Sequence, residues 1–84
     1  MLNKIKEIIQ AVLPEATIYV LDPRNDGHHL EAVVISDEFI GLSLIKQHKI
    51  VMNSLKEEFK SSVHALGLKT YTQEKWAQET NKPV

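Results

Sequence analysis

The sequence predicts an α+β fold of the order α-β-β-α-(α)-β-α, in which helices cover one face of a three-stranded mixed sheet. Three observations predict it. Apolar residues recur at helical spacing near the N-terminus and again in the middle of the chain. Three short segments are rich in β-branched and aromatic residues. A long helical stretch separates the second of these segments from the third, so the last strand joins the sheet by a crossover connection.

Residues 2–13 form the first predicted helix. Polar and charged residues separate apolar ones that recur at helical spacing, and Pro14 ends the pattern because proline lacks a backbone N–H. The apolar positions are Leu2, Ile5, Ile8, Ile9, Val12 and Leu13.

Residues 17–22 and 29–36 are the first two predicted strands. The segment between them, PRNDGH, consists largely of turn-forming residues, so the two strands are expected to form a hairpin with an exposed loop. In the second strand Leu30, Ala32 and Val34 alternate and therefore share one face.

The middle of the chain is predicted to be helical. Residues 37–43 form a turn, and Ser43 is the expected N-cap of the central helix. An apolar stripe then marks one face of a single helix or of two short helices in sequence. The stripe consists of Leu44, His48, Val51, Leu55 and Phe59. Residues 65–72 are the third strand, Thr72 is a plausible cap for a terminal helical turn, and residues 80–84 are expected to fray.

Size and composition predict one small domain over residues 1–84, with an ordered core of about residues 2–77. The 84 residues are 43% apolar and include no cysteine, so no disulfide supplements the core. The longest apolar runs are far too short to cross a bilayer, and residues 1–14 lack the pattern of a signal peptide. We therefore expect a cytoplasmic protein, or one of an organelle matrix, without a membrane partner.

The net charge of −1 is unevenly distributed. Residues 1–42 carry three basic and seven acidic side chains, a net charge of −4, whereas residues 43–84 carry seven basic and four acidic ones, a net charge of +3. Any contact with a polyanion is therefore expected in the second half of the chain.

Several short motifs, in their order along the chain, resemble the BolA family. In that family a strand ending in Val-Ser leads to Phe-x-Gly, then to Arg-His-Arg with a following Val, then to His-Ala-Leu and Thr-Pro-x-x-Trp. The counterparts here are Phe39 and Gly41, Gln47 to Lys49 with Val51, His64 to Leu66, and Thr72 to Trp76. Gln47 and Lys49 replace both arginines, and Gln73 replaces the usual proline.

The resemblance covers about residues 2–77, and the stretch DGHHLEAVVIS is most similar to the short bacterial branch that includes the IbaG proteins. It implies a fold similar to class II KH domains. It also implies two activities. One is DNA binding as a transcriptional regulator, and the other is pairing with a monothiol glutaredoxin around a shared 2Fe-2S cluster.

His64 is the first candidate cluster ligand. Histidine in a small domain is most often structural or exposed, but His64 matches the cluster-binding histidine of the family's His-Ala-Leu motif. Iron-sulfur clusters are held mainly by thiolates, with imidazole replacing some of them in Rieske centres. A chain without cysteine can therefore contribute only imidazole, and the resemblance implies that the partner's cysteine and glutathione supply the remaining ligands. The isolated chain is expected to hold no cofactor.

His28 and His29 are the candidates for a second ligand, because in the family it comes from the loop between the first two strands. Adjacent residues entering a strand point to opposite faces, so the two are not expected to bind the same iron. His29 matches the histidine of the Gly-x-His pattern in the short branch, and His28 remains an alternative, as does a pair of solvated loop histidines. A zinc site built from a loop histidine, His64 and a carboxylate is a further possibility, although no paired-ligand spacing supports it.

A helical basic surface is the alternative functional site. In one continuous helix over residues 44–60, four lysines would fall within about 80° of one another. They are Lys46, Lys49, Lys56 and Lys60. Such a row could contact the phosphates of duplex DNA, together with His48 of the family's proposed DNA-contact segment, although a solvated helix face or a break in the helix are competing interpretations. His48 itself could instead be a half-buried residue that braces the helix. RNA binding is less expected, because Gly41 is not part of a Gly-x-x-Gly loop.

The sequence does not predict an enzyme. Ser61, Ser62 and His64 lie close together in the chain, but there is no nucleophile elbow, no glycine cluster of the oxyanion-hole type and no phosphate-binding glycine-rich loop. A binding or adaptor module is expected instead.

Overall fold

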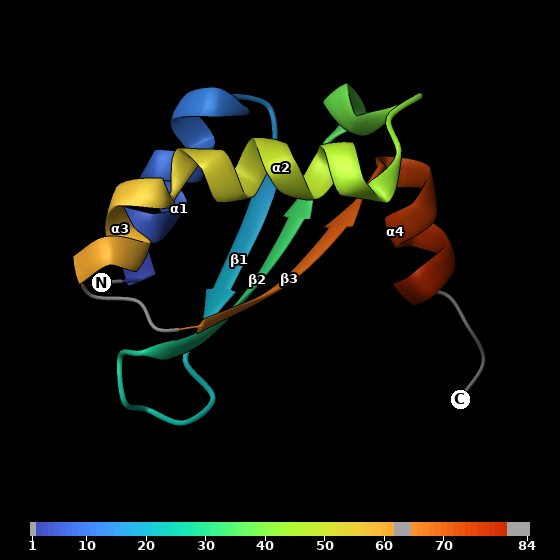
Figure 1. The fold of residues 1–84 in the computed structure, drawn as a ribbon. Coiled ribbons are helices and arrows are strands. Elements are labelled where there is room, and N and C mark those ends of the chain that lie inside the picture. The colour runs from blue at the N-terminus through green and yellow to red at the C-terminus, as the bar shows by residue number, and fades with distance from the viewer. Residues whose placement is uncertain (1, 62–64, 81–84) are drawn as a thin grey trace.

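The computed structural model describes residues 2–61 and 65–80 of the chain (Figure 1). In chain order the elements are α1 (Leu2–Val12), β1 (Thr17–Leu21), β2 (His29–Ile35), the 3-10 helix η1 (Asp37–Phe39), α2 (Leu44–Ser54), α3 (Lys56–Ser61), β3 (Ala65–Tyr71) and α4 (Gln73–Thr80). This order confirms the prediction. Of the two predicted alternatives, one helix or two short helices, the structure has two, with the break at Leu55.

The three strands form one mixed sheet in the order β1-β2-β3. β1 pairs antiparallel with β2, with Thr17 opposite Ile35, which confirms the predicted hairpin. β3 pairs parallel with β2, from His29 opposite Ala65 to Ile35 opposite Tyr71. The segment with α2 and α3 is therefore the crossover, and β3 lies at the edge of the sheet (Figure 1).

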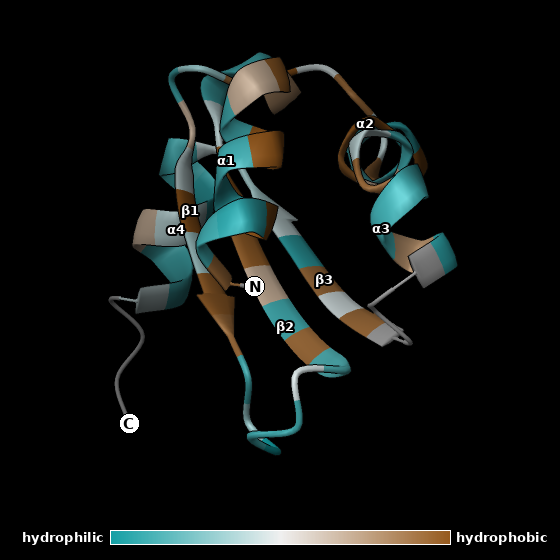
Figure 2. Ribbon diagram, turned by 90° about the vertical axis from the view of Figure 1, so that its left-hand side faces the viewer, coloured by the Kyte–Doolittle hydropathy of each residue, from teal (hydrophilic) through white to brown (hydrophobic). Residues whose placement is uncertain are grey.

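The hydrophobic core lies between the sheet and the layer of α1, α2 and α3. Leu30, Ala32 and Val34 of β2 are buried on the same face of the sheet, as predicted from their alternation, and Leu30 and Val34 belong to one core cluster with Ile5 and Ile9 of α1. Figure 2 shows the apolar positions along the strands in brown. Each fully buried aliphatic side chain contributes roughly 1.5–3 kcal/mol. Other core members are Leu13, Ile18, Phe39, Val51 and Leu55.

Side-chain caps define where the helices begin. Ser43 Oγ accepts the backbone N–H of Lys46 at 3.2 Å, and Thr72 Oγ1 accepts that of Lys75 at 3.3 Å, so both predicted caps are present. Helix α4 runs to Thr80 and is longer than the expected single terminal turn.

The predicted turn before α2 contains the short helix η1, which buried Ser36 caps through its hydroxyl. Its last residue, Phe39, is only 1% exposed. Gly41 follows with φ of +82°, a left-handed conformation that favours glycine. The turn thus inserts an aromatic side chain into the core before the chain enters α2.

The predicted stripe on the central helix is wrong at its first position. Leu44 is 64% exposed, whereas Gln47 is 8% exposed and precedes buried Val51 by one helical turn. The face of α2 that meets the sheet therefore begins at Gln47. The reason is a polar partner on the sheet, because buried Thr70 donates its hydroxyl hydrogen bond to Gln47.

The prediction that helices cover one face of the sheet holds for α1, α2 and α3, but not for α4, which lies away from their layer in both views (Figures 1 and 2). The ring of Trp76 in α4 lies 6.2 Å from the ring of Tyr19 and 5.2 Å from that of Tyr71, measured between centroids. Both tyrosines alternate with core-facing neighbours, Ile18 and Thr70, so their side chains point to the opposite face.

Candidate functional site

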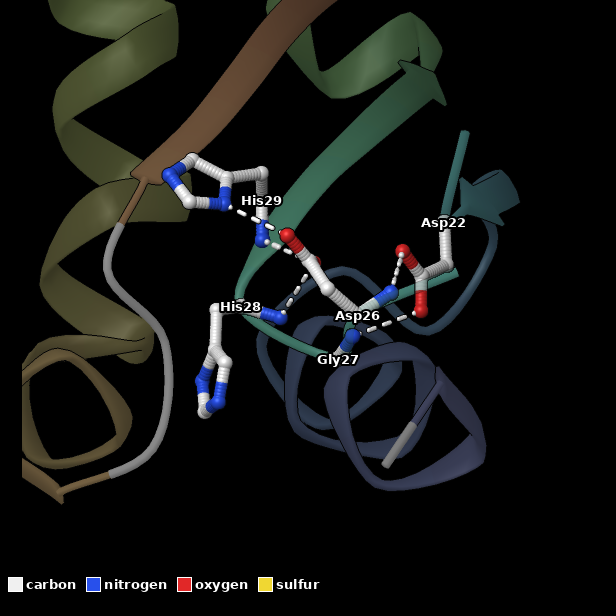
Figure 3. A network of polar contacts seen from close by, with 5 residues as sticks. All are labelled: Asp22, Asp26, Gly27, His28 and His29. Carbon is white, nitrogen blue, oxygen red and sulfur yellow. Dashed lines mark hydrogen bonds and ion pairs between the residues drawn. The ribbon is translucent and has the colours of Figure 1, made fainter. Parts of the chain in front are cut away.

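Two aspartates organise the loop between β1 and β2 (Figure 3). The carboxylate of Asp22 accepts the backbone N–H groups of Asp26 at 3.2 Å and of Gly27 at 2.8 Å. Asn25 and Gly27 have φ of +53° and +73°, which asparagine and glycine tolerate better than other residues. The predicted turn is therefore an ordered one, held by hydrogen bonds to a side chain.

Asp26 fixes the position of His29 at the start of β2. Its Oδ1 accepts the backbone N–H of His28 at 2.9 Å and that of His29 at 3.0 Å, and its Oδ2 lies 2.8 Å from Nδ1 of His29. The two backbone N–H groups, and then the His29 ring, hold the pKa of Asp26 well below its usual range. Asp26 is therefore ionised at neutral pH.

This contact determines the tautomer of the His29 ring. An ionised carboxylate can only accept hydrogen bonds, so Nδ1 must carry the proton. In the neutral ring Nε2 then holds the lone pair, which is the form in which histidine binds metals. A carboxylate is one of the common acceptors for the second ring nitrogen of a metal-binding histidine.

His28 contacts Asp26 through its backbone. Its backbone N–H donates to Asp26, and the two imidazole rings point in different directions (Figure 3). His28 is exposed, whereas His29 is half-buried. The geometry therefore distinguishes two histidines that are adjacent in the sequence.

The predicted ligand His64 lies outside the described residues. Ala65, which follows it in the sequence, begins β3 and pairs with His29 in the parallel register. Neighbouring strands are about 4.8 Å apart. The first residues of β2 and β3 are thus side by side at the loop end of the sheet (Figure 1).

Residues 2–61 and 65–80 contain no group of three or more histidine, cysteine, aspartate or glutamate side chains that could hold a metal ion. A metal centre that used His29 would therefore need ligands from beyond these residues. The zinc site suggested by the sequence includes His64 and remains a prediction.

The predicted lysines occupy two helices instead of one. Lys46 and Lys49 belong to α2, and Lys56 and Lys60 to α3, so the angular relation expected for a continuous helix does not apply across Leu55. Lys60 lies 3.6 Å from Glu57, an exposed pair. The first three lysines are exposed and form no ion pair with any residue that the structure describes.

Residues 47–49, the central segment of the expected DNA contact, differ in how exposed they are. Lys49 is exposed, His48 is half-buried, and Gln47 is buried. Gln47 Nε2 donates to the carbonyl of Leu42 at 2.9 Å, and its Oε1 accepts from Thr70 at 2.7 Å. The side chain of Gln47 therefore faces the sheet and is not available for a contact with DNA. No hydrogen bond of the His48 ring is found within the described part of the chain, so the expected backbone brace is not observed there.

Sequence reasoning missed Asp26 and Gln47. The spacing Asp-x-x-His, with Asp26 three residues before His29, was a usable signal, since an aspartate side chain in a turn commonly accepts nearby backbone N–H groups. Gln47 precedes Val51 by four residues, and this helical spacing placed it on the core face.

Together these features define a small α+β domain with an ordered histidine loop at one end of a mixed sheet and lysines on its crossover helices. The chain belongs to the BolA-like protein family, whose family model matches residues 9–75. No described helix is long and apolar enough to span a membrane.

Known relatives agree in sequence and in fold. The chain is 31% identical over 81 residues to the DNA-binding transcriptional regulator BolA of Escherichia coli, covering 88% of this chain and 77% of that protein. A BolA homologue from Coxiella burnetii is 36% identical with a TM-score of 0.77, covering 92% and 96% of the two chains. Yeast Fra2 is 31% identical with a TM-score of 0.72, covering 93% and 85%. The E. coli relative is thus named as a regulator and not as an enzyme.

Proposed function

We propose that this protein is a cytoplasmic, non-enzymatic adaptor that pairs with a monothiol glutaredoxin and shares a 2Fe-2S cluster with it. In this proposal His64 and His29 each offer an imidazole nitrogen, and the cysteine of the partner and glutathione supply the sulfur ligands. The cluster is cargo that the pair transfers or senses. The chain has no cysteine, so it can take part in such a centre only through imidazole.

The observation that carries this proposal is the contact between Asp26 and His29. It fixes the ring at the position in β2 that pairs with Ala65, the residue after His64. It also leaves the lone pair of the neutral ring on Nε2. A ligand held in one tautomer by a carboxylate is pre-organised for a metal. This supports His29 over His28 as the loop ligand.

The experiment is a titration of the purified chain into a monothiol glutaredoxin that carries its cluster, followed by visible absorption and circular dichroism. Replacing a thiolate by an imidazole changes the electronic environment of the iron, so the spectrum should change and saturate at a fixed ratio. His64→Ala and His29→Ala should each reduce or abolish the change.

His28→Ala is the matched control, because it removes the neighbouring imidazole and leaves the backbone bonds to Asp26 in place. It should behave like the unaltered chain. A spectrum that does not respond to the chain, or that responds equally after His29→Ala and His28→Ala, contradicts the proposed ligand set.

DNA binding is a second candidate, favoured by the name of the E. coli relative and by three exposed lysines without an ion pair in the described structure. Lys46 and Lys49 on α2 and Lys56 on α3 would contact phosphates. Each neutralised phosphate adds affinity that salt removes.

Binding to a promoter duplex, measured by fluorescence anisotropy at several salt concentrations, tests this candidate. Lys49→Ala and Lys56→Ala should weaken binding and reduce the salt dependence. Lys60→Ala is a useful comparison, since Lys60 is already paired with Glu57. Equal binding to a scrambled duplex would contradict sequence-specific regulation.

A further inference from the structure

The outer edge of β3 has no partner strand. β3 is the last strand in the order β1-β2-β3. The carbonyl of Tyr71 accepts the N–H of Ser36 at 2.9 Å, so the backbone of Tyr71 points toward β2. Because successive residues of a strand direct their backbone groups to alternate sides, those of Leu66, Leu68 and Thr70 point outward. Among the described residues no element pairs with this edge.

A groove of about 590 Å³ lies beside this free edge. Helix α2 forms one wall through Leu44 and His48, and β3 forms the other through residues 68–71. Phe39, which is buried, and the Gln47 to Thr70 hydrogen bond contribute to its base. A strand edge next to a helix is the arrangement in which several domains bind extended peptides by strand addition.

The groove is basic and has an apolar rim. Its titratable lining residues include His48, Lys69 and Lys75, and no carboxylate lines it. Both lysines are exposed and form no ion pair with the residues described here. Leu44, at the mouth, is 64% exposed. An occupant that complements this lining carries negative charge and at least one apolar side chain.

We propose that this groove binds an extended acidic peptide segment of a partner protein, which adds to the sheet as a fourth strand beside β3. Main-chain hydrogen bonds to Leu66, Leu68 and Thr70 give the affinity. Carboxylates that approach Lys69 and Lys75, and an apolar side chain against Leu44, give the preference for this peptide chemistry.

A peptide fits the edge better than two other occupants. Single-stranded nucleic acid offers phosphate acceptors to the lysines, but it cannot form a ladder with alternating backbone N–H and C=O groups. A second copy of the chain would bring Lys69 and Lys75 of the two copies toward each other, and like charges oppose such pairing. The inference is separate from the cluster proposal, since neither His28 nor His29 lines the groove.

The test uses a synthetic peptide of alternating valine and glutamate, titrated into the 15N-labelled chain and followed by NMR. Amide shifts should concentrate on β3 and the first half of α2. Hydrogen exchange should slow at the outward amides of Leu66, Leu68 and Thr70, while the inward amides of Gly67 and Lys69 stay protected with and without peptide. This alternation is specific for strand addition.

Two controls separate backbone pairing from charge. The same peptide with N-methylated backbone nitrogens on alternate residues should lose the slowed exchange. Lys75→Glu should weaken binding about fivefold or more, whereas Lys6→Glu, at an exposed position on α1 that does not line the groove, should leave it unchanged.

Three results would overturn the proposal. One is the absence of shifts at β3. The second is the same alternating protection on addition of oligothymidine, which would indicate nucleic acid as the occupant. The third is the same protection arising with chain concentration in the absence of peptide, which would indicate self-association through β3.

Discussion

The hydroxyl of Thr70 on β3 donates a 2.7 Å hydrogen bond to Oε1 of Gln47 on α2, and both residues are buried. The other end of the Gln47 amide donates to the carbonyl of Leu42 at 2.9 Å. One side chain thus joins the crossover helix, the edge strand and the turn that precedes the helix. The interaction also explains why a polar residue occupies a core-facing helical position.

Gln47→Ala should destabilise the fold by about 1–3 kcal/mol, because it leaves the buried hydroxyl of Thr70 without an acceptor. Thr70→Val should cost a similar amount by leaving Oε1 of Gln47 unpaired. Urea unfolding followed by circular dichroism measures both. The double variant Gln47→Ala with Thr70→Val should cost less than the sum of the single changes, since the Thr70 hydroxyl and the Gln47 Oε1 that each single change leaves unpaired are then both absent.

Lys49→Ala, at an exposed position on the same helix, is the control and should change the free energy of unfolding by less than about 0.5 kcal/mol. Additive effects of the two core changes would contradict the view that the hydrogen bond couples α2 to β3.

Trp76→Ala should loosen α4 from the sheet. The indole contacts the rings of Tyr19 and Tyr71, and such aromatic pairs contribute about 0.5–1.5 kcal/mol beyond their buried area. The loss should reach about 1–2 kcal/mol. Amide exchange should also accelerate within residues 73–80, while α1 and α2 keep their protection. Gln78→Ala, exposed on the same helix, should have neither effect.

The carboxyl group of Asp26 should titrate below its ordinary pKa of 3.8 in the folded protein. A folded-state pKa below the unfolded-state pKa stabilises the folded protein at pH values above the unfolded-state pKa. This contribution is lost as the pH falls through the folded-state pKa. The carboxyl 13C shift of Asp26, recorded against pH, gives the midpoint. His29→Ala should raise it only in part, because the two backbone N–H groups are the larger cause and remain.

His28→Ala serves as the reference for this titration, since it keeps both backbone donors and the His29 ring. An Asp26 midpoint at or above the ordinary value in the unaltered chain would contradict the described loop.

Asp26→Asn should change the tautomer of His29. The carboxylate keeps the proton on Nδ1, whereas an amide can either donate or accept and does not impose one tautomer. Two-bond 1H–15N correlation spectra of the imidazole report which nitrogen carries the proton. The unaltered chain should show a single tautomer with Nδ1 protonated, and the variant a mixture. A mixture of tautomers in both proteins would show that Asp26 does not position the proton on the His29 ring.

The order of helices and strands could be predicted because local sequence patterns determine it. The periodicity of residues 2–13, the turn residues between the first two strands and the caps Ser43 and Thr72 all act within a few residues of the chain. The break at Leu55 could not be chosen from the stripe alone, since one helix and two short helices share the same spacing.

The missed features depend on contacts between distant segments. Gln47 is buried because Thr70, which is 23 residues later, offers it a partner. Helix α4 lies across the other face because Trp76 meets Tyr19 from the first strand. Of the candidate site, the loop histidines were identified from sequence, but the choice between His28 and His29 required the position of Asp26. Nothing in the spacing of the two histidines contains that information.

We propose that this cysteine-free chain binds a cluster by imidazole while its partner supplies sulfur. Pulsed electron paramagnetic resonance of the reduced cluster, formed from unlabelled monothiol glutaredoxin and the chain labelled with 15N-histidine, measures this directly. We expect strong 15N hyperfine couplings from coordinated histidine nitrogen, reduced by His29→Ala and by His64→Ala and unchanged by His28→Ala. A spectrum with no coupling from the labelled histidines would contradict it.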